Sequence, residues 1–229
     1  ESLCKFRHLE HDINWQLDNE NSTTDILFYS CGETDRIFKV EGFIDRSAYH
    51  VFNMVSDYSY TTKSQWFNTM DMLQCVGSSI NEQYDIDSNY KIKVVQSSFA
   101  FPGLITKPRN LLGLTWSRYN QAKQSYTTLY TSLQGEHEIY KCPEKHVPFH
   151  GDYSIWVNHI EEDKCFLSMI IDLRSIGFTT GIILNKLKQI LVQHFKLFST
   201  VNYDEIYSPW KCEMCTKVND APLLECRYC

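Results

Sequence analysis

The sequence ends a long series of strand-like segments with one amphipathic helix, and this order limits the folds open to the chain. One face of residues 183–198 is apolar and carries Ile183, Leu187, Ile190, Leu191, His194, Phe195 and Phe198. The polar residues of this segment lie largely opposite: Lys186, Lys188, Gln189, Gln193 and Lys196. Such a stripe predicts a helix of about four turns, whose apolar face must be buried against another element.

The segments before this helix predict a long antiparallel sheet. Residues 26–29 and 37–44 form a hairpin pattern, and residues 72–76, 84–86, 90–97, 111–119, 125–133, 153–160 and 165–173 follow with short connections. Two further helices are expected at residues 3–17 and 46–55, the second capped by Asp45. The expected fold class is α+β, with a curved sheet in meander order wrapped around the C-terminal helix and a cavity between them.

Charge and cysteine usage narrow the partners and the compartment. The formal net charge is −6, so a broad phosphate-binding surface is not expected and nucleic acid is a weak candidate. Five of the nine cysteines are scattered along the chain, which is typical of reduced thiols. We find no stretch long enough to cross a bilayer. A cytoplasmic or nuclear protein is therefore expected.

Several short sequences, in order, resemble the START family of lipid-transfer domains, related to the steroidogenic acute regulatory protein. They are Phe38-Lys39-Val40-Glu41-Gly42, Trp66, Lys107-Pro108-Arg109-Asn110, Asp172-Leu173, Gly177 and Asn185. Phe67 after Trp66 and Asn110 depart from the usual family pattern, and a proline usual near Thr179 is missing. The resemblance implies a START-like helix-grip domain over residues 1–202. It also implies one lipid in a tunnel under the C-terminal helix, with an Ω-shaped loop at residues 99–107 as part of the lid.

The resemblance also implies the lipid contacts. Residues of the Ω-loop and the strand after it would line or close the tunnel, together with two from the closing helix: Phe99, Phe101, Leu104, Arg109, Leu111, Gly113, Thr115, Ser117, Ile190 and His194. Small residues at 113, 115 and 117 would leave room for a ligand, and Arg109 could bind an anionic headgroup. The apolar residues of the Ω-loop could also enter a membrane surface. Alternatively, they plug the domain's own core, Arg109 forms an internal ion pair, and His194 is a core histidine.

The last twenty residues predict a separate zinc finger. Cys212, Cys215, Cys226 and Cys229 form two CxxC pairs, which can direct four thiolates to one Zn²⁺ per chain. With Trp210 and Asn219, the segment 210–229 resembles the zinc fingers of the Ran-binding nucleoporin, and residues 203–209 form a linker. Asp220, Pro222 and Leu223 stand where RNA-reading members have an aromatic residue and arginines, so RNA reading is not expected. Thr216 matches the ubiquitin-binding members and Lys217 does not.

Together these features predict a lipid-binding or lipid-transfer protein that contacts membranes transiently, with a finger for protein contact or structural support. The alternative is an adaptor whose finger binds ubiquitin or another protein and whose START-like domain carries no transferable lipid. No enzyme is expected, because the sequence holds neither a GxSxG nucleophile motif nor a glycine-rich phosphate loop. His137, Cys142, His146 and His150 crowd one loop, but their spacing fits no common metal site.

Overall fold

The computed structural model describes residues 14–31, 34–57, 74–87, 90–101, 107–133, 141–174, 181–201, 210–211 and 218–219. The chain divides into two compact units, Glu1–Ser199 and Thr200–Cys229. None of the described helices is long and apolar enough to span a membrane.

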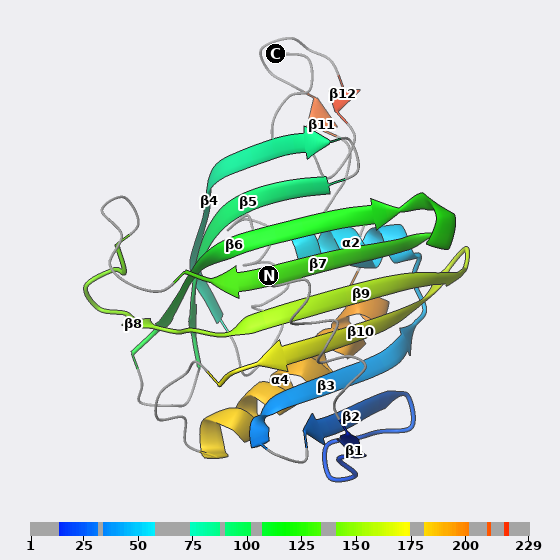
Figure 1. Cartoon of the computed structure of the whole chain (residues 1–229), viewed down its shortest axis with the longest axis horizontal. Coiled ribbons are helices and arrows are strands. Elements are labelled where there is room, and N and C mark those ends of the chain that lie inside the picture. Colours follow the sequence, from blue (N-terminus) through cyan, green and yellow to red (C-terminus); the bar gives the residue numbers. More distant parts are fainter. Residues whose placement is uncertain are drawn as a thin grey trace. The chain divides into compact units, whose positions relative to one another are not determined.

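The first unit is built on one antiparallel sheet with a short parallel addition (Figure 1). Its described strands are β1 (Trp15–Leu17), β2 (Ile26–Cys31), β3 (Thr34–Ile44), β4 (Gln74–Asp87), β5 (Tyr90–Ala100), β6 (Arg109–Asn120), β7 (Ser125–Ser132), β8 (Val147–Pro148), β9 (Asp152–Glu161) and β10 (Lys164–Asp172). Their order is β1-β2-β3-β10-β9-β7-β6-β5-β4, and β8 pairs with β6. A 3-10 turn, η1 (Gln121–Lys123), joins β6 to β7.

The predicted antiparallel sheet is confirmed, with two differences in its strands. The order is a meander from β4 to β10, but β3 pairs with β10 and thereby joins the first hairpin to the last strand. Residues 74–87 form one strand where two were expected. Its pairing with β5 shifts register at three places, and such bulges interrupt the alternation by which a strand is recognised in a sequence.

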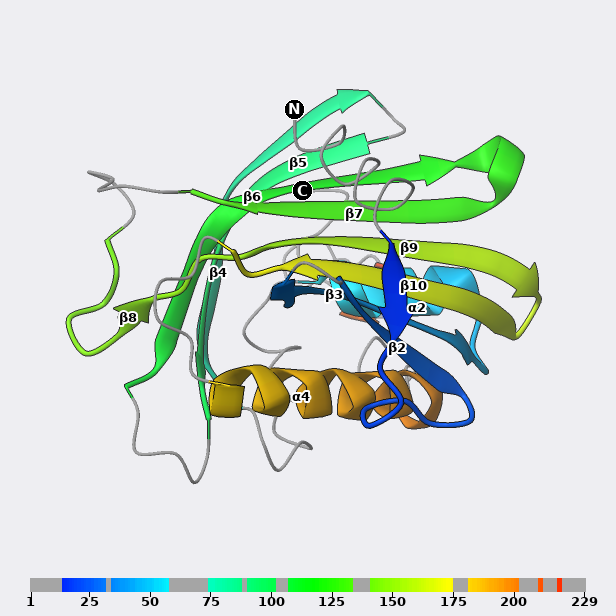
Figure 2. The same ribbon diagram turned by 60° about the horizontal axis from the view of Figure 1, so that its bottom comes forward.

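Two helices, α2 (Ala48–Ser56) and α4 (Gly181–Thr200), lie on the concave face of this sheet, which curves over α4 (Figure 2). Helix α2 packs against β7, β9 and β10. At Gly42 in β3, an added Cβ would lie 3.3 Å from the Phe195 ring and 2.7 Å from the backbone oxygen of Asp25. Because Gly42 has no side chain, α4 and the turn before β2 can both approach β3 closely.

The convex face carries its own apolar cluster, which explains an incorrect prediction near the N-terminus. Cys31, Ile37, Leu129 and Ile170 are buried there, and Trp15, Trp116 and Trp156 pack against them. Residues 15–17, expected at the end of a helix, instead pair with β2 as strand β1. Sheet pairing and the packing of Trp15 override the helical periodicity. Residues 1–13 of the expected helix lie outside the described residues.

The predicted helix at 46–55 is confirmed as α2, but its predicted cap is wrong. Ser47 is the N-cap, and its Oγ accepts a hydrogen bond from the backbone N–H of His50 at 3.3 Å. Asp45 is exposed two residues upstream. Both residues are good caps by type, and the position at which the backbone enters the helix selects Ser47.

The second unit contains one described element, a pair of short antiparallel strands. Trp210–Lys211 (β11) pairs with Val218–Asn219 (β12), in the register Trp210 to Asn219 and Lys211 to Val218. The four cysteines of the predicted finger lie outside the described residues.

The cap assignment predicts different effects for two substitutions. Ser47→Ala removes the acceptor for the His50 N–H and should lower the free energy of unfolding by about 1 kcal/mol. Asp45→Ala, the matched control, should change it by less than about 0.5 kcal/mol. Urea unfolding followed by circular dichroism measures both, and a larger loss for Asp45→Ala would contradict the assignment.

Candidate functional site

An apolar cavity of about 230 Å³ lies between the concave face of the sheet and α4. Helix α4 contributes Leu187, Ile190, Leu191, His194 and Phe198. The sheet and its connections contribute Phe38, Cys75, Val95, Ser97, Ser98, Phe99, Leu111, Tyr130, Phe149, Gly151, Asp152, Tyr153, Ile155, Met169, Ile171 and Leu173, and α2 contributes Val55. Distant parts of the chain thus line one apolar cavity, and most small-molecule sites are concave and apolar in this way.

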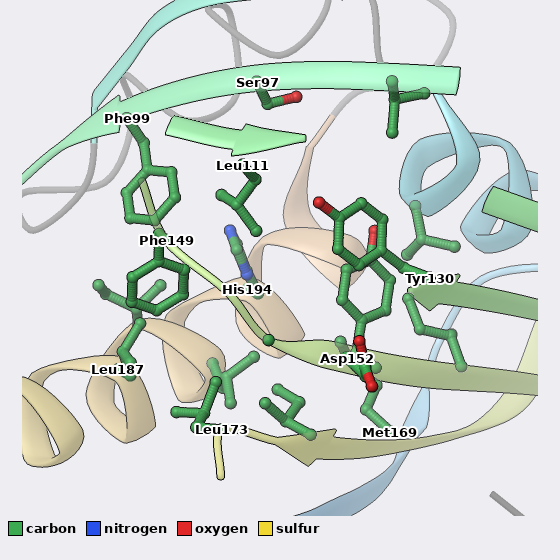
Figure 3. Close-up of a pocket in the computed structure, with 18 of the residues that line it drawn as sticks. Ser97, Phe99, Leu111, Tyr130, Phe149, Asp152, Met169, Leu173, Leu187 and His194 are labelled. Atoms are coloured by element: carbon green, nitrogen blue, oxygen red, sulfur yellow. The ribbon is translucent and has the colours of Figure 1, made fainter. Parts of the chain in front are cut away.

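Aromatic pairs stand at two sides of the cavity (Figure 3). Tyr130 and Tyr153 face each other across β7 and β9, with ring centroids 4.8 Å apart and nearly parallel planes. Phe99 packs edge-on against Phe149, at 5.6 Å. These rings are large and stiff, so they define the shape of the space more firmly than flexible aliphatic side chains would.

Four of the residues predicted from the sequence line this cavity: Phe99, Leu111, Ile190 and His194. The apolar stripe of α4 faces the sheet as expected, because Leu184, Ile190, Leu191, Phe195 and Phe198 are all buried. The imidazole of His194 points from α4 toward Leu111 (Figure 3). Lys188, expected on the polar side of this helix, is also buried.

Gly113, Thr115 and Ser117 share the face of β6 on which Leu111 lies, but they do not line the cavity. A Cβ at Gly113 would collide with the Tyr130 ring, so this glycine makes room for Tyr130 rather than for a ligand. Thr115 is 1% exposed. The hydroxyl of Ser117 lies 3.1 Å from that of Thr128, which lies 3.2 Å from the hydroxyl of Ser56 in α2. Helix α2 therefore fills the space beyond Tyr130.

Two residues predicted to contact the ligand at the Ω-loop, Phe101 and Arg109, do not line the cavity. Phe101 is buried and packs edge-on against Phe99 at 5.4 Å, so both rings contact the core in this conformation. Arg109 is half-buried at the start of β6 and does not line the cavity. Leu104 lies outside the described residues.

Sequence reasoning missed the other main contributors to the wall: Tyr130, Phe149, Tyr153 and Met169. Tyr130 and Tyr153 lie on strands that were predicted, and the alternation of buried residues along β7 and β9 could have marked them. Phe149 follows the two-residue strand β8, whose pairing with β6 no sequence pattern indicated.

No family model and no curated protein sequence matches the chain. Solved structures do match. Human STARD10 has a TM-score of 0.64 at 15% identity, covering 89% of this chain and 77% of its own. Human StAR-related lipid transfer protein 5 has a TM-score of 0.61 at 12% identity, covering 90% and 92%. The lipid transfer and protein localization domain of human StarD13 has a TM-score of 0.62 at 15% identity, covering 86% and 93%.

The chain has a START-like fold. The α+β architecture predicted for the large domain is thereby confirmed at the level of the fold, since identities this low carry no further conclusion.

An ion pair holds α4 of the START-like domain against the turn between β1 and β2. The Nζ of Lys188 donates to Oδ2 of Asp18 at 2.8 Å, and both side chains are largely buried. Asn21 donates to the same carboxylate from its backbone N–H and its side-chain amide. Burial raises the pKa of Asp18, but the hydrogen bonds from Lys188 and Asn21 outweigh burial and lower it below its ordinary value of 3.8.

This shift predicts how stability depends on pH. Because the pKa of Asp18 is lower in the folded state, the stabilisation is complete above about pH 5 and is lost as pH falls through the lowered pKa. Asp18→Asn should lower the free energy of unfolding at pH 7 by about 1–3 kcal/mol and flatten its decrease between about pH 5 and pH 2.

Urea unfolding at several pH values tests this, with Asp25→Asn as the control. Asp25 is exposed in the same turn, and its side chain accepts a long hydrogen bond of 3.5 Å from the hydroxyl of Thr24. Equal losses in the two variants would show that the Asp18–Lys188 pair does not stabilise the fold.

Proposed function

We propose that the START-like domain binds one lipid molecule in the cavity beneath α4 and carries it between membranes. The observation that carries the proposal is the apolar cavity at the place where the sheet curves over α4. The fold shared with structures named as lipid transfer proteins supports it. Apolar walls favour hydrocarbon, since each buried CH₂ contributes about 0.8 kcal/mol.

Exchange of a lipid requires an opening, and α4 is the element whose contacts would have to change. Its apolar face forms one wall of the cavity, and its outer attachment is the Lys188–Asp18 pair. In the proposed mechanism, α4 and the Ω-loop segment move apart at a membrane surface, the lipid replaces protein contacts, and the cavity closes again. The proposal therefore includes a cytoplasmic protein that contacts a membrane surface only transiently.

An adaptor that carries no transferable lipid is the competing function. The cavity of about 230 Å³ is smaller than the roughly 300–1,000 Å³ typical of ligand pockets, which favours a filled scaffold. In that case the C-terminal finger, over residues 210–229, would bind ubiquitin or another protein. Native mass spectrometry of the purified chain separates the two functions, because a lipid carrier retains a stoichiometric lipid.

We further propose one structural Zn²⁺ per chain, held by Cys212, Cys215, Cys226 and Cys229 after a linker at 203–209. The pairing of β11 with β12 supports this, because the segment that joins these strands contains Cys212 and Cys215. A CxxC turn between two paired strands is a common way to present two thiolates, and four thiolates suit tetrahedral Zn²⁺. The metal would stabilise a segment too short to have a hydrophobic core.

Two tryptophan substitutions on one face of β6 test the lipid cavity. Leu111 lines the cavity, so Leu111→Trp should cost less than about 1 kcal/mol of stability and abolish lipid retention. Thr115 is tightly packed outside it, so Thr115→Trp should cost about 1–3 kcal/mol or more. Urea unfolding and native mass spectrometry give the two readouts. Equal destabilisation, with no lipid on the wild-type chain, would support the scaffold.

The zinc site is tested by elemental analysis. The wild-type chain should contain one zinc, and Cys212→Ser should lose it, whereas Cys142→Ser should retain it. Chelation should leave the melting of the START-like domain unchanged, because the four thiolates lie in the other compact unit. Full zinc retention by Cys212→Ser would place the metal elsewhere, for example at the loop that contains His146.

A further inference from the structure

The cavity has a polar group in its middle. His194 projects from α4 toward Leu111, with Phe99 and Phe149 on one side of it and Tyr130 on the other (Figure 3). Its ring also stacks on Phe198, one turn further along the helix, at 6.2 Å. An imidazole can both donate and accept a hydrogen bond, so it suits a hydroxyl or carbonyl oxygen.

The other polar groups at the wall are hydroxyls and a carboxylate. Ser98 accepts a hydrogen bond from the side-chain amide of Asn110 at 2.8 Å. Asp152 accepts one from the backbone N–H of Ser132 at 3.0 Å. Arg109, the cation expected to bind an anionic headgroup, stands outside the described wall, and no Lys or Arg is among the described residues that line the cavity.

The size of the cavity also favours a small ligand over a two-chain phospholipid. At ~30 Å³ per water-sized group, 230 Å³ accommodates about eight such groups. A sterol or a single-chain glyceride has about 25–28 non-hydrogen atoms, roughly three times as many, and a two-chain phospholipid with its headgroup has about 54, roughly seven times as many. Any of these lipids requires the cavity to enlarge, but the sterol or single-chain glyceride needs only about half the volume that the phospholipid needs.

We propose that the ligand is a compact neutral lipid, with one hydrocarbon body and an uncharged head of hydroxyl or carbonyl groups, and that His194 binds a polar atom of this head. This inference rests on the proposed lipid-binding function. The tyrosine pair and the Phe99–Phe149 pair enclose the hydrocarbon on either side of His194. A sterol and a single-chain glyceride share this chemistry, and the experiment distinguishes them.

The test measures binding of four radiolabelled probes to the full chain by gel filtration. The probes are cholesterol, 5-cholestene (the same ring system without the hydroxyl), 1-oleoylglycerol and dioleoylphosphatidylcholine, the last supplied as small vesicles. The wild-type chain should retain about one cholesterol or one 1-oleoylglycerol, and less than about a tenth as much phosphatidylcholine. Cholesterol without 1-oleoylglycerol indicates a ring system, and the reverse indicates a chain.

Substitutions at position 194 test the role of the imidazole. His194→Leu should weaken binding of the preferred hydroxylated probe about tenfold and, if that probe is cholesterol, leave 5-cholestene unchanged. His194→Gln, which keeps a donor and an acceptor, should bind the preferred probe within about threefold of wild type. Gln189→Leu, on the exposed side of α4, is the matched control. Thermal melting of each variant shows whether it is folded.

The outcomes separate this inference from the function on which it rests. Preferential retention of phosphatidylcholine would overturn the neutral ligand and leave lipid binding intact. Unchanged binding of the hydroxylated probe by folded His194→Leu would overturn the assignment of His194. Retention of no probe at all would instead overturn the proposed function.

Discussion

The structure depends on how α4 is held against a sheet that is too curved to contact it everywhere. At Gly42 the helix approaches β3 closely, because no side chain separates Phe195 from the strand. The Lys188–Asp18 pair fastens the same helix to the turn that precedes β2. Between these contacts and the far strands of the sheet, the two surfaces separate and the cavity opens.

Side chains, rather than backbone, determine how much of that space remains. The Tyr130 ring occupies the position that a side chain at residue 113 would need, and α2 closes the region beyond it. The Phe99, Phe101 and Phe149 rings close the other side by packing on one another. The cavity is therefore bounded by stiff aromatic groups, which favours selection of a ligand by shape.

Much of the fold could be predicted from local patterns, and the failures have identifiable causes. The β2–β3 hairpin, the helix near residue 50 and the final amphipathic helix follow from period and turn chemistry, and the structure confirms them. The division of β4 into two strands was wrong because bulges conceal its alternation. Thr115 and Ser117 were assigned the correct face of β6, but residues from α2, distant in sequence, decide which part of that face a ligand can reach.

The sequence by itself determined which residues share a face of each strand and helix, because the periods of 2 and 3.6 follow from backbone geometry alone. The helical period therefore indicated Ile190 and His194 as inward-facing residues, and the START resemblance added Phe99 and Leu111. Only the tertiary structure decided where along each face the cavity lies and which polar groups it contains. Those features depend on contacts between residues far apart in the chain, such as Tyr130 with Gly113 and Lys188 with Asp18, which no local period encodes.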